Sequence, residues 1–154
     1  MTDTTKEKLK EIVAKAMTDP ALYRDLMLVY ERGHEMSGIT RFVMQGGGDY
    51  TLASNNPRRQ SSFSTASRLD EDQRQSLLSA ILETSLLDVL TSTRNIGDDE
   101  IPTEVDLDYD DLHFQIVIWA GDALENPDFH RFERVLWTLM RRLSNDQVGF
   151  GPRD

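Results

Sequence analysis

The chain has 154 residues and a formal net charge of −10 at pH 7. This length predicts one domain with a core of its own, and the acidic balance argues against nucleic acids and anionic membranes as partners, because both are polyanions. The sequence contains no cysteine, which excludes disulfides and thiolate zinc sites. No apolar run reaches membrane-spanning length, and the polar start lacks the apolar region of a signal peptide, so we expect a cytoplasmic protein without a cofactor.

The pattern of apolar residues in the first 25 positions predicts a helical N-terminal extension. Residues 4–17 place apolar side chains at helical spacing between Lys and Glu residues. These apolar residues are Leu9, Ile12, Val13, Ala16 and Met17. Asp19-Pro20 then predicts the start of a short second helix to about Asp25. The pattern leaves open whether this extension packs on the body or swings free.

Four short β-strands are predicted next. They cover residues 26–32, 39–44, 50–53 and 62–67, with polar or glycine-rich loops between them. The loop Gly46-Gly47-Gly48 invites comparison with a phosphate-binding loop, but no Lys-Ser/Thr follows, and Asp49 would repel an anion. A hairpin turn is therefore the better interpretation of the three glycines.

A capped helix and an acidic loop follow the strands. Asp70 and Gln73 have the spacing of a capping box, which predicts a helix from there to about Glu83. Residues 85–90 predict another turn or two of helix. Residues 92–102 form a polar, acidic loop that leads into the most regular part of the sequence.

Residues 103–119 predict a β-hairpin with one buried face. Apolar and charged residues alternate up to Tyr109, and the parity of the apolar positions flips after Asp110-Asp111. A two-residue turn there would place every apolar residue of both strands on one side. The predicted cross-strand pairs are Tyr109 with Leu112, Leu107 with Phe114, Val105 with Ile116, and Thr103 with Ile118. Asp-Asp is not the best two-residue turn, which leaves a slightly longer loop open.

The sequence ends with its clearest amphipathic helix. Gly121-Asp122 predicts the end of the hairpin, and Asn126-Pro127 predicts a helix start. Apolar residues then recur every three or four positions, at Phe129, Phe132, Leu136, Leu139, Met140 and Leu143. The element order predicts a single α+β domain over residues 1–146, with an antiparallel sheet of about five or six strands covered on one face by helices. Residues 147–154 predict a flexible tail.

One stretch resembles a known family. In Val29–Val43 a strand ends at Arg32, and after a short loop Gly38-Ile39 resumes the next strand, which is similar to the opening hairpin of the emfourin family. These are small bacterial inhibitors of thermolysin-like metalloproteases. The resemblance covers roughly residues 26–143 and implies the same α+β layout. His34 and Glu35 replace the family's paired glycines, and no inhibitory residue is carried over.

The remaining motifs do not predict catalysis or metal binding. His34-Glu35 begins like a His-Glu-x-x-His zinc motif, but position 38 is glycine. An EF-hand loop counted from Asp106 would need glycine and glutamate where Asp111 and Val117 stand. A pairing of Asp108 with His113 across the hairpin is best interpreted as a surface ion pair, so no catalytic residue is predicted.

The acidic end of the hairpin is the predicted functional surface. We expect a small non-enzymatic module that binds a protein as an inhibitor, immunity-type factor or adaptor, and the acidic charge favours a basic partner. The predicted surface consists of Asp98, Asp99, Glu100, Glu104, Asp106, Asp108, His113 and Trp119. The alternative is a divalent-cation-dependent enzyme or sensor that uses the carboxylates of residues 98–111. A homodimer formed through a sheet edge or the last helix is a third interpretation.

Overall fold

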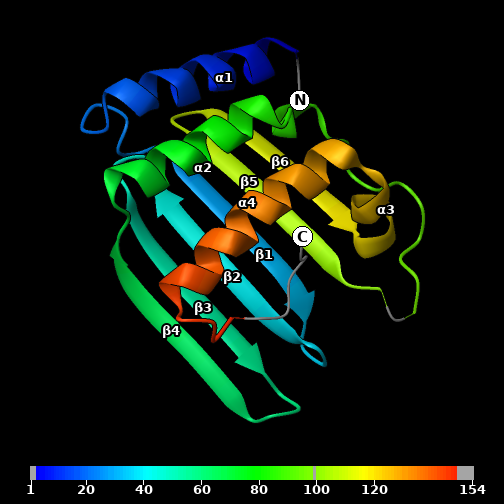
Figure 1. Ribbon diagram of the computed structural model, residues 1–154. Helices are drawn as coiled ribbons and strands as arrows, with labels where there is room; N and C mark the ends of the chain where they lie inside the picture. Colours follow the sequence, from blue (N-terminus) through cyan, green and yellow to red (C-terminus); the bar gives the residue numbers. More distant parts are fainter. Residues whose placement is uncertain (1–2, 99, 149–154) are drawn as a thin grey trace.

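One antiparallel sheet carries a layer of helices on one face (Figure 1). The computed structural model describes residues 3–98 and 100–148. The strands are β1 (Met27–His34), β2 (Gly38–Gln45), β3 (Asp49–Asn56), β4 (Ser61–Arg68), β5 (Pro102–Tyr109) and β6 (Leu112–Trp119). The helices are α1 (Asp3–Thr18), α2 (Glu71–Glu83), the short 3-10 helix η1 (Leu86–Asp88), α3 (Ala120–Glu125) and α4 (Pro127–Leu143). The predicted α+β class, the sheet size and the N-terminal helix are confirmed.

The sheet consists of two parts that meet at β1. Its strand order is β4-β3-β2-β1-β5-β6, and every neighbouring pair is antiparallel. Strands β1 to β4 follow one another as hairpins. The chain then crosses over the sheet as α2 and returns to add β5 against the free side of β1 (Figure 1).

The hairpin of β5 and β6 has the predicted register. Tyr109 pairs with Leu112, and the three further predicted pairs also form. Asp110 adopts a φ of 55°, the left-handed conformation that a two-residue hairpin turn requires. An aspartate tolerates this conformation better than most residues, and no longer loop is needed.

Alternation along the strands separates a buried face from an uncovered one. On β5 the side chains of Thr103, Val105 and Leu107 are buried under the helices, while those between them are partly exposed on the other side. The core also takes Tyr30 from β1 and Phe42 from β2. We call the sheet face without helices the open face. No helix of the described residues is long and apolar enough to cross a bilayer.

The N-terminal helix packs on the body, which the sequence left open. Leu9, Val13 and Ala16 of α1 are buried. The guanidinium of Arg74, on α2, is itself buried and donates hydrogen bonds to the carbonyls of Ala16 (2.7 Å) and Met17 (3.1 Å). These carbonyls belong to the last turn of α1, where no intrahelical donor remains. Arg74 therefore caps α1 and joins it to α2.

Three local predictions were wrong in the segments between the main elements. Residues 20–25 form turns and not a helix, because the N–H of Gly46 donates to the carbonyl of Leu26 (2.7 Å) and draws the chain into the sheet. The predicted helix at 85–90 is limited to η1, since Ser85 has a left-handed φ of 56° that interrupts an α-helix. Gly121-Asp122 lies inside α3 instead of ending the hairpin.

The end of the described chain is packed further than predicted. Residue 147 was the expected start of a flexible tail, yet Val148 is buried, and its N–H donates to Oγ of Ser144 (3.1 Å). The buried side chain of Val148 extends the core beyond α4. The rest of the predicted tail, residues 149–154, lies outside the described residues.

The buried guanidinium of Arg74 generates a stability prediction. Replacing Arg74 with Met leaves the buried carbonyl of Ala16 without its side-chain donor and the carbonyl of Met17 with the amide of Gln75 as its remaining one, which we expect to cost about 3 kcal/mol of unfolding free energy. The control is Arg68→Met, which removes an exposed ion pair to Asp49 (3.5 Å) and costs less than about 1 kcal/mol. Urea denaturation measures both. Equal losses in the two variants would show that Arg74 does not anchor α1.

Candidate functional site

The structure divides the predicted binding surface into two groups. Glu104, Asp106 and Asp108 point from β5 onto the open face, and His113 joins them from β6. We call these four residues the acidic strip. Glu100 and Trp119 belong instead to a polar network at the other end of the hairpin. Of the remaining predicted residues, Asp98 is exposed in the loop before β5, and Asp99 lies outside the described residues.

The imidazole of His113 links two carboxylates of the acidic strip. Its Nδ1 is in hydrogen-bond contact with Asp108, the cross-strand neighbour, and its Nε2 lies 3.8 Å from a carboxylate oxygen of Asp106. The side chain of Gln115, opposite Asp106, donates to Glu104. The strip is thus ordered by contacts across the hairpin, and the predicted pairing of Asp108 with His113 is confirmed.

The pKa values of the strip follow from this packing. Burial raises the pKa of Asp106, and the neighbouring charge of Glu104 raises it further. The hydrogen bond to Asp108 raises the pKa of His113, against a smaller opposing effect of burial. A proton on His113 therefore offsets part of the negative charge of the strip under mildly acidic conditions.

The acidic strip borders a row of small and apolar residues on the open face. Strand register places Asp106 beside Val29, Val29 beside Val43, Val43 beside Thr51, and Thr51 beside Ala66. This row runs across four strands, from β1 to β4, and its two valines are half-buried although no helix of the described residues covers them. The acidic strip adjoins one end of this row, and the ion pairs Glu31–Arg41 and Asp49–Arg68 lie on the same face, so the open face has the mixed apolar and charged composition of a protein contact surface.

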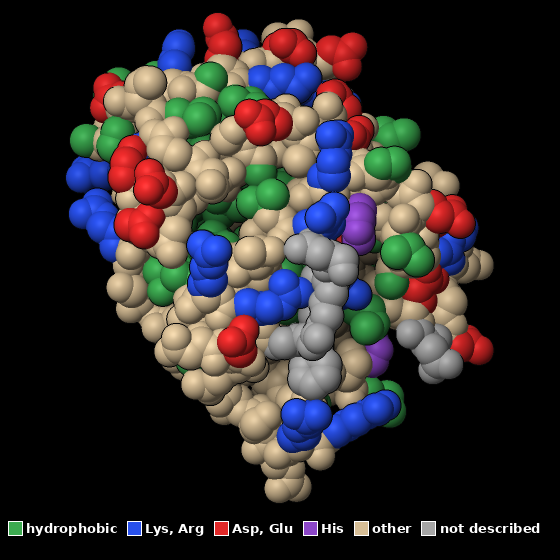
Figure 2. Space-filling view, viewed as in Figure 1, with side chains coloured by type: hydrophobic (Ala, Val, Ile, Leu, Met, Phe, Trp, Pro, Cys, Tyr) green, Lys and Arg blue, Asp and Glu red, His purple; other side chains and the backbone are tan. Residues whose placement is uncertain are grey.

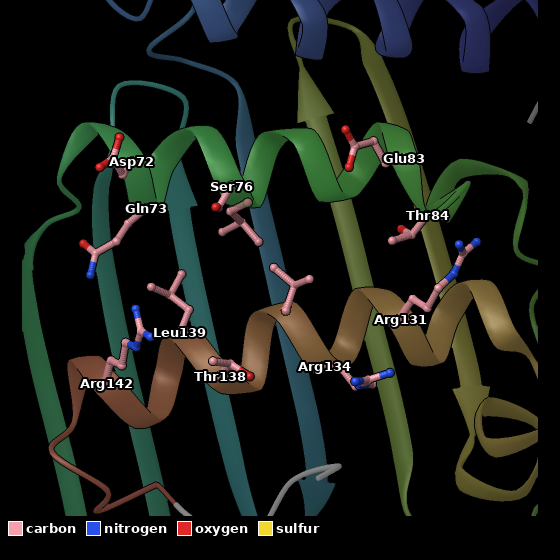
Figure 3. Close-up of a pocket in the computed structure, with 12 residues that line it drawn as sticks. Asp72, Gln73, Ser76, Glu83, Thr84, Arg131, Arg134, Thr138, Leu139 and Arg142 are labelled. Carbon is pink, nitrogen blue, oxygen red and sulfur yellow. The ribbon is translucent and has the colours of Figure 1, made fainter. Parts of the chain in front are cut away.

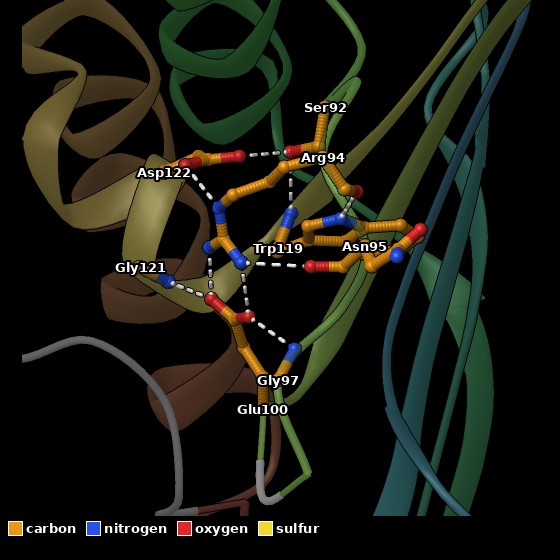
Figure 4. A network of polar contacts seen from close by, with 8 residues as sticks. All are labelled: Ser92, Arg94, Asn95, Gly97, Glu100, Trp119, Gly121 and Asp122. Carbon is orange, nitrogen blue, oxygen red and sulfur yellow. Dashed lines mark hydrogen bonds and ion pairs between the residues drawn. The ribbon is translucent and has the colours of Figure 1, made fainter.

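Glu100 and Trp119 are held inside a network that closes the loop before β5 (Figure 4). The guanidinium of Arg94 contacts the Glu100 carboxylate at 2.5 Å and the Asp122 carboxylate at 3.1 Å. Glu100 also accepts backbone N–H bonds from Gly97 (2.9 Å) and Gly121 (2.8 Å). We call this group the Arg94 network.

The Arg94 network gives both predicted residues an internal role. The indole N–H of Trp119 donates to the carbonyl of Arg94 (2.8 Å), so the loop fixes the orientation of the ring (Figure 4). Hydrogen bonding to Arg94, with the two backbone N–H groups, lowers the pKa of Glu100 to about 2. Glu100 is thus an ionised carboxylate whose charge is balanced by Arg94 and which orders the loop, whereas no arginine of the described residues pairs with the carboxylates of the acidic strip.

Sequence reasoning missed a buried polar cluster under α4. The carboxyl of Glu133 is buried, accepts a hydrogen bond from the hydroxyl of Tyr30 and lies 3.5 Å from the guanidinium of Arg32. The indole of Trp137 donates to the same hydroxyl (2.8 Å). Burial raises the pKa of Glu133 and that of Tyr30.

The spacing of residues along α4 could have revealed from the sequence that Glu133 is buried. Glu133 stands four residues after Phe129 and four before Trp137, so it shares their buried stripe. A small cavity of about 180 Å³ adjoins the cluster beside α3. Because each polar group in the cluster has a partner within the chain, its evident role is to fix α4 on β1.

A second feature that the sequence did not reveal is a groove between α2 and α4 (Figure 3). It has a volume of about 590 Å³ and lies on the helical side, away from the acidic strip. Within residues 3–98 and 100–148, no three His, Asp or Glu side chains converge closely enough to hold a metal ion. The cation-dependent alternative stays a prediction that no geometry of these residues favours.

Comparisons with known proteins do not assign the chain to a family. No protein-family model matches the sequence, and no curated protein matches it. The resemblance to the emfourin family stays a prediction.

The raised pKa of His113 generates a pH-dependent prediction. The pKa of His113 is higher in the folded protein than in the unfolded chain. Its ion pair with Asp108 therefore stabilises the fold fully at a pH below the unfolded pKa, and this stabilisation is lost as the pH rises through the folded pKa. Since His113 is 56% exposed, we expect less than about 1 kcal/mol. NMR titration of the imidazole should show a lower pKa in Asp108→Asn than in the wild type. An unchanged imidazole pKa would contradict the contact.

The Arg94 network generates an acid-sensitivity prediction. Because the pKa of Glu100 is lowered to about 2, its stabilisation of the loop is present above the ordinary value of 4.5 and is lost as pH falls through about 2. We expect the indole N–H signal of Trp119 to lose its protection from exchange in this range. Glu100→Gln should show the unprotected signal already at neutral pH.

The second tryptophan provides the control for the same experiment. The indole of Trp137 is buried and bonded to Tyr30, so its N–H signal reports on the whole fold. Protection of Trp119 should be lost before that of Trp137 as the pH falls. Simultaneous loss of both signals would mean that the loop has no separate acid response.

Proposed function

We propose that this chain is a small acidic, non-enzymatic module that binds another protein through the open face of its sheet. It acts by contact, as an inhibitor, an immunity-type factor or an adaptor. The observation that supports the proposal is the row on the open face that leads from Asp106 through Val29 and Val43 to Ala66. A uniformly polar sheet face would need no partner, whereas this one combines apolar area with charge.

The charge of the acidic strip favours a basic partner. Glu104, Asp106 and Asp108 lie on one strand, and Glu31 stands opposite Glu104 on β1. Glu31 is paired with Arg41 at 3.0 Å, while the cation within 4 Å of the acidic strip's carboxylates, among residues 3–98 and 100–148, is the titratable His113. Complementary charge on a partner would speed encounter and lower the repulsion among these carboxylates.

The apolar row would provide binding affinity, and the charges of the acidic strip would provide specificity for the partner. Burying Val29 and Val43 under a partner removes apolar area from water, a favourable contribution that charge alone does not give. The exposed Asp98 and the partly exposed Trp119 lie at the far end of the hairpin, where they would form the edge of the contact. Protease inhibition and a cytoplasmic location remain predictions from the sequence.

Charge reversal on the acidic strip tests the proposal. Asp106→Lys with Asp108→Lys should lower capture of the partner from a lysate of the source organism at least about tenfold at low salt. The matched control is Glu11→Lys with Glu125→Lys, which makes the same change of charge at exposed positions of α1 and α3 and should leave capture intact. Tagged pull-down with mass spectrometry measures all three proteins.

Two results would contradict the proposed surface. The first is equal capture by the reversed variant and the wild type, provided that circular dichroism shows both to be folded. The second is the absence of any specific protein on the wild type at low salt. Addition of EDTA to the pull-down should change nothing, and a partner that is lost with EDTA would favour the cation-dependent alternative.

A further inference from the structure

The groove between α2 and α4 has walls of opposite charge. Its α2 wall carries Asp72 and Glu83, one at each end of the helix, and its α4 wall carries arginines. These are Arg131, Arg134 and Arg142. Figure 2 shows the basic side chains along α4 and acidic ones over both ends of α2, with hydrophobic side chains between them. An acidic chain has therefore concentrated arginines on one side of an apolar groove.

Helices α2 and α4 run in opposite directions, so each end of the groove has an acidic residue on one wall and an arginine on the other. Asp72, at the start of α2, lies at the same end of the groove as Arg142, at the end of α4 (Figure 3). Glu83 and Arg131 lie together at the other end (Figure 3). Among the described residues neither Asp72, Glu83 nor Arg142 forms an ion pair of 4 Å or less, whereas Arg131 is paired with Asp128 on its own helix at 2.5 Å.

We propose that the occupant of this surface is a second copy of the chain, related by a two-fold axis that runs along the groove. With such an axis the grooves of the two copies face each other. Positions along the groove stay the same, but the α2 side of one copy lies over the α4 side of the other. The α2 wall of one copy then faces the α4 wall of its partner, without a shift along the axis. Asp72 meets a partner arginine at one end and Glu83 does so at the other, which is the self-complementarity of an isologous dimer.

Charge distinguishes this arrangement from the other two-fold one. An axis perpendicular to the groove, in the plane of the contact, would place α2 on α2 and α4 on α4, with acidic residues against acidic ones and arginines against arginines. Both axes set facing helices antiparallel, which is favourable for their dipoles, so the charges alone decide between the two arrangements. At the centre of the surface, Ser76 and Thr138 are small and allow the two helix layers to approach.

The size of the surface predicts a weak dimer. The 13 residues of α2 span about 20 Å, and two adjacent helices are about 20 Å wide, so the contact buries on the order of 800 Å² in total. Stable interfaces commonly bury about 1,600 Å². We therefore expect a dissociation constant on the order of 10–100 µM, with a strong dependence on salt.

This dimer would be bivalent. The contact uses the helical layer, so the open faces of the two sheets point outward in opposite directions. Each copy would keep its acidic strip exposed, and two partner sites on one target could be bound together. Only this consequence depends on the proposed function, since self-association can be measured without any partner.

A charge-swap experiment tests the dimer. One variant carries Asp72→Lys and Glu83→Lys, so both walls are basic, and a second carries Arg131→Glu and Arg142→Glu, so both walls are acidic. Sedimentation velocity over roughly 5–500 µM should show a wild-type dimer that weakens at least about tenfold between roughly 20 mM and 500 mM salt. Each variant alone should be monomeric, and an equimolar mixture of the two should restore the dimer.

The controls separate this proposal from the function of the open face. Asp106→Lys with Asp108→Lys makes the same change of charge outside the groove and should leave the dimer intact. A wild type that is monomeric at every concentration would overturn the proposal. So would a dimer that persists in both groove variants, because another surface would then join the copies. A groove that retains a different helical protein, and no second copy, would also overturn it.

Discussion

The pairing of β1 with β5 is the contact on which the other features of this molecule depend. It joins two parts of the sheet that are separated by α2 in sequence, and it sets Val29 against Asp106. A slip of one residue would turn the carboxylates of β5 into the core and Val105 and Leu107 out of it. The energetic cost of burying those carboxylates without partners enforces the register. The apolar row and the acidic strip adjoin because of this register.

Two buried polar anchors fix the helical layer over that sheet. Arg74 binds the end of α1 and Glu133 binds Tyr30 of β1, each through hydrogen bonds that no apolar side chain could make. Apolar packing alone is tolerant of small shifts between helices and sheet. A satisfied polar contact has a defined direction, so these anchors also determine the spacing of the helices. Together with the apolar stripe of α4, Glu133 therefore fixes the position of this helix and of the arginine wall of the groove.

The two faces of the molecule have different electrostatic character, and this explains how an acidic chain can offer two kinds of contact. The open face gathers carboxylates on β5 beside an apolar row, whereas the helical side brings the arginines of α4 opposite the acids of α2. A partner bound on one face would leave the other face accessible. In the proposed dimer the helical sides meet, and the sheets carry their open faces outward.

The sequence by itself determined the local structure wherever the pattern of side chains is compatible with a single register or a single cap. The alternation around Asp110-Asp111 allowed only one register that buries all the apolar residues, and Asp70 with Gln73 had one capping geometry. It also identified the carboxylates of the acidic strip, because alternation assigns them to the uncovered face. These predictions need only interactions between residues that are near one another in the chain.

Only the tertiary structure decided which distant segments meet. The strand order, the place of Val29 beside Asp106, and the packing of α1 through Arg74 depend on contacts between segments far apart in sequence. The same holds for Glu100, whose charge is neutralised by Arg94 and two backbone N–H groups. A carboxylate has the same appearance in sequence whether it faces water or an arginine. Its role is set by neighbours that only the folded chain supplies.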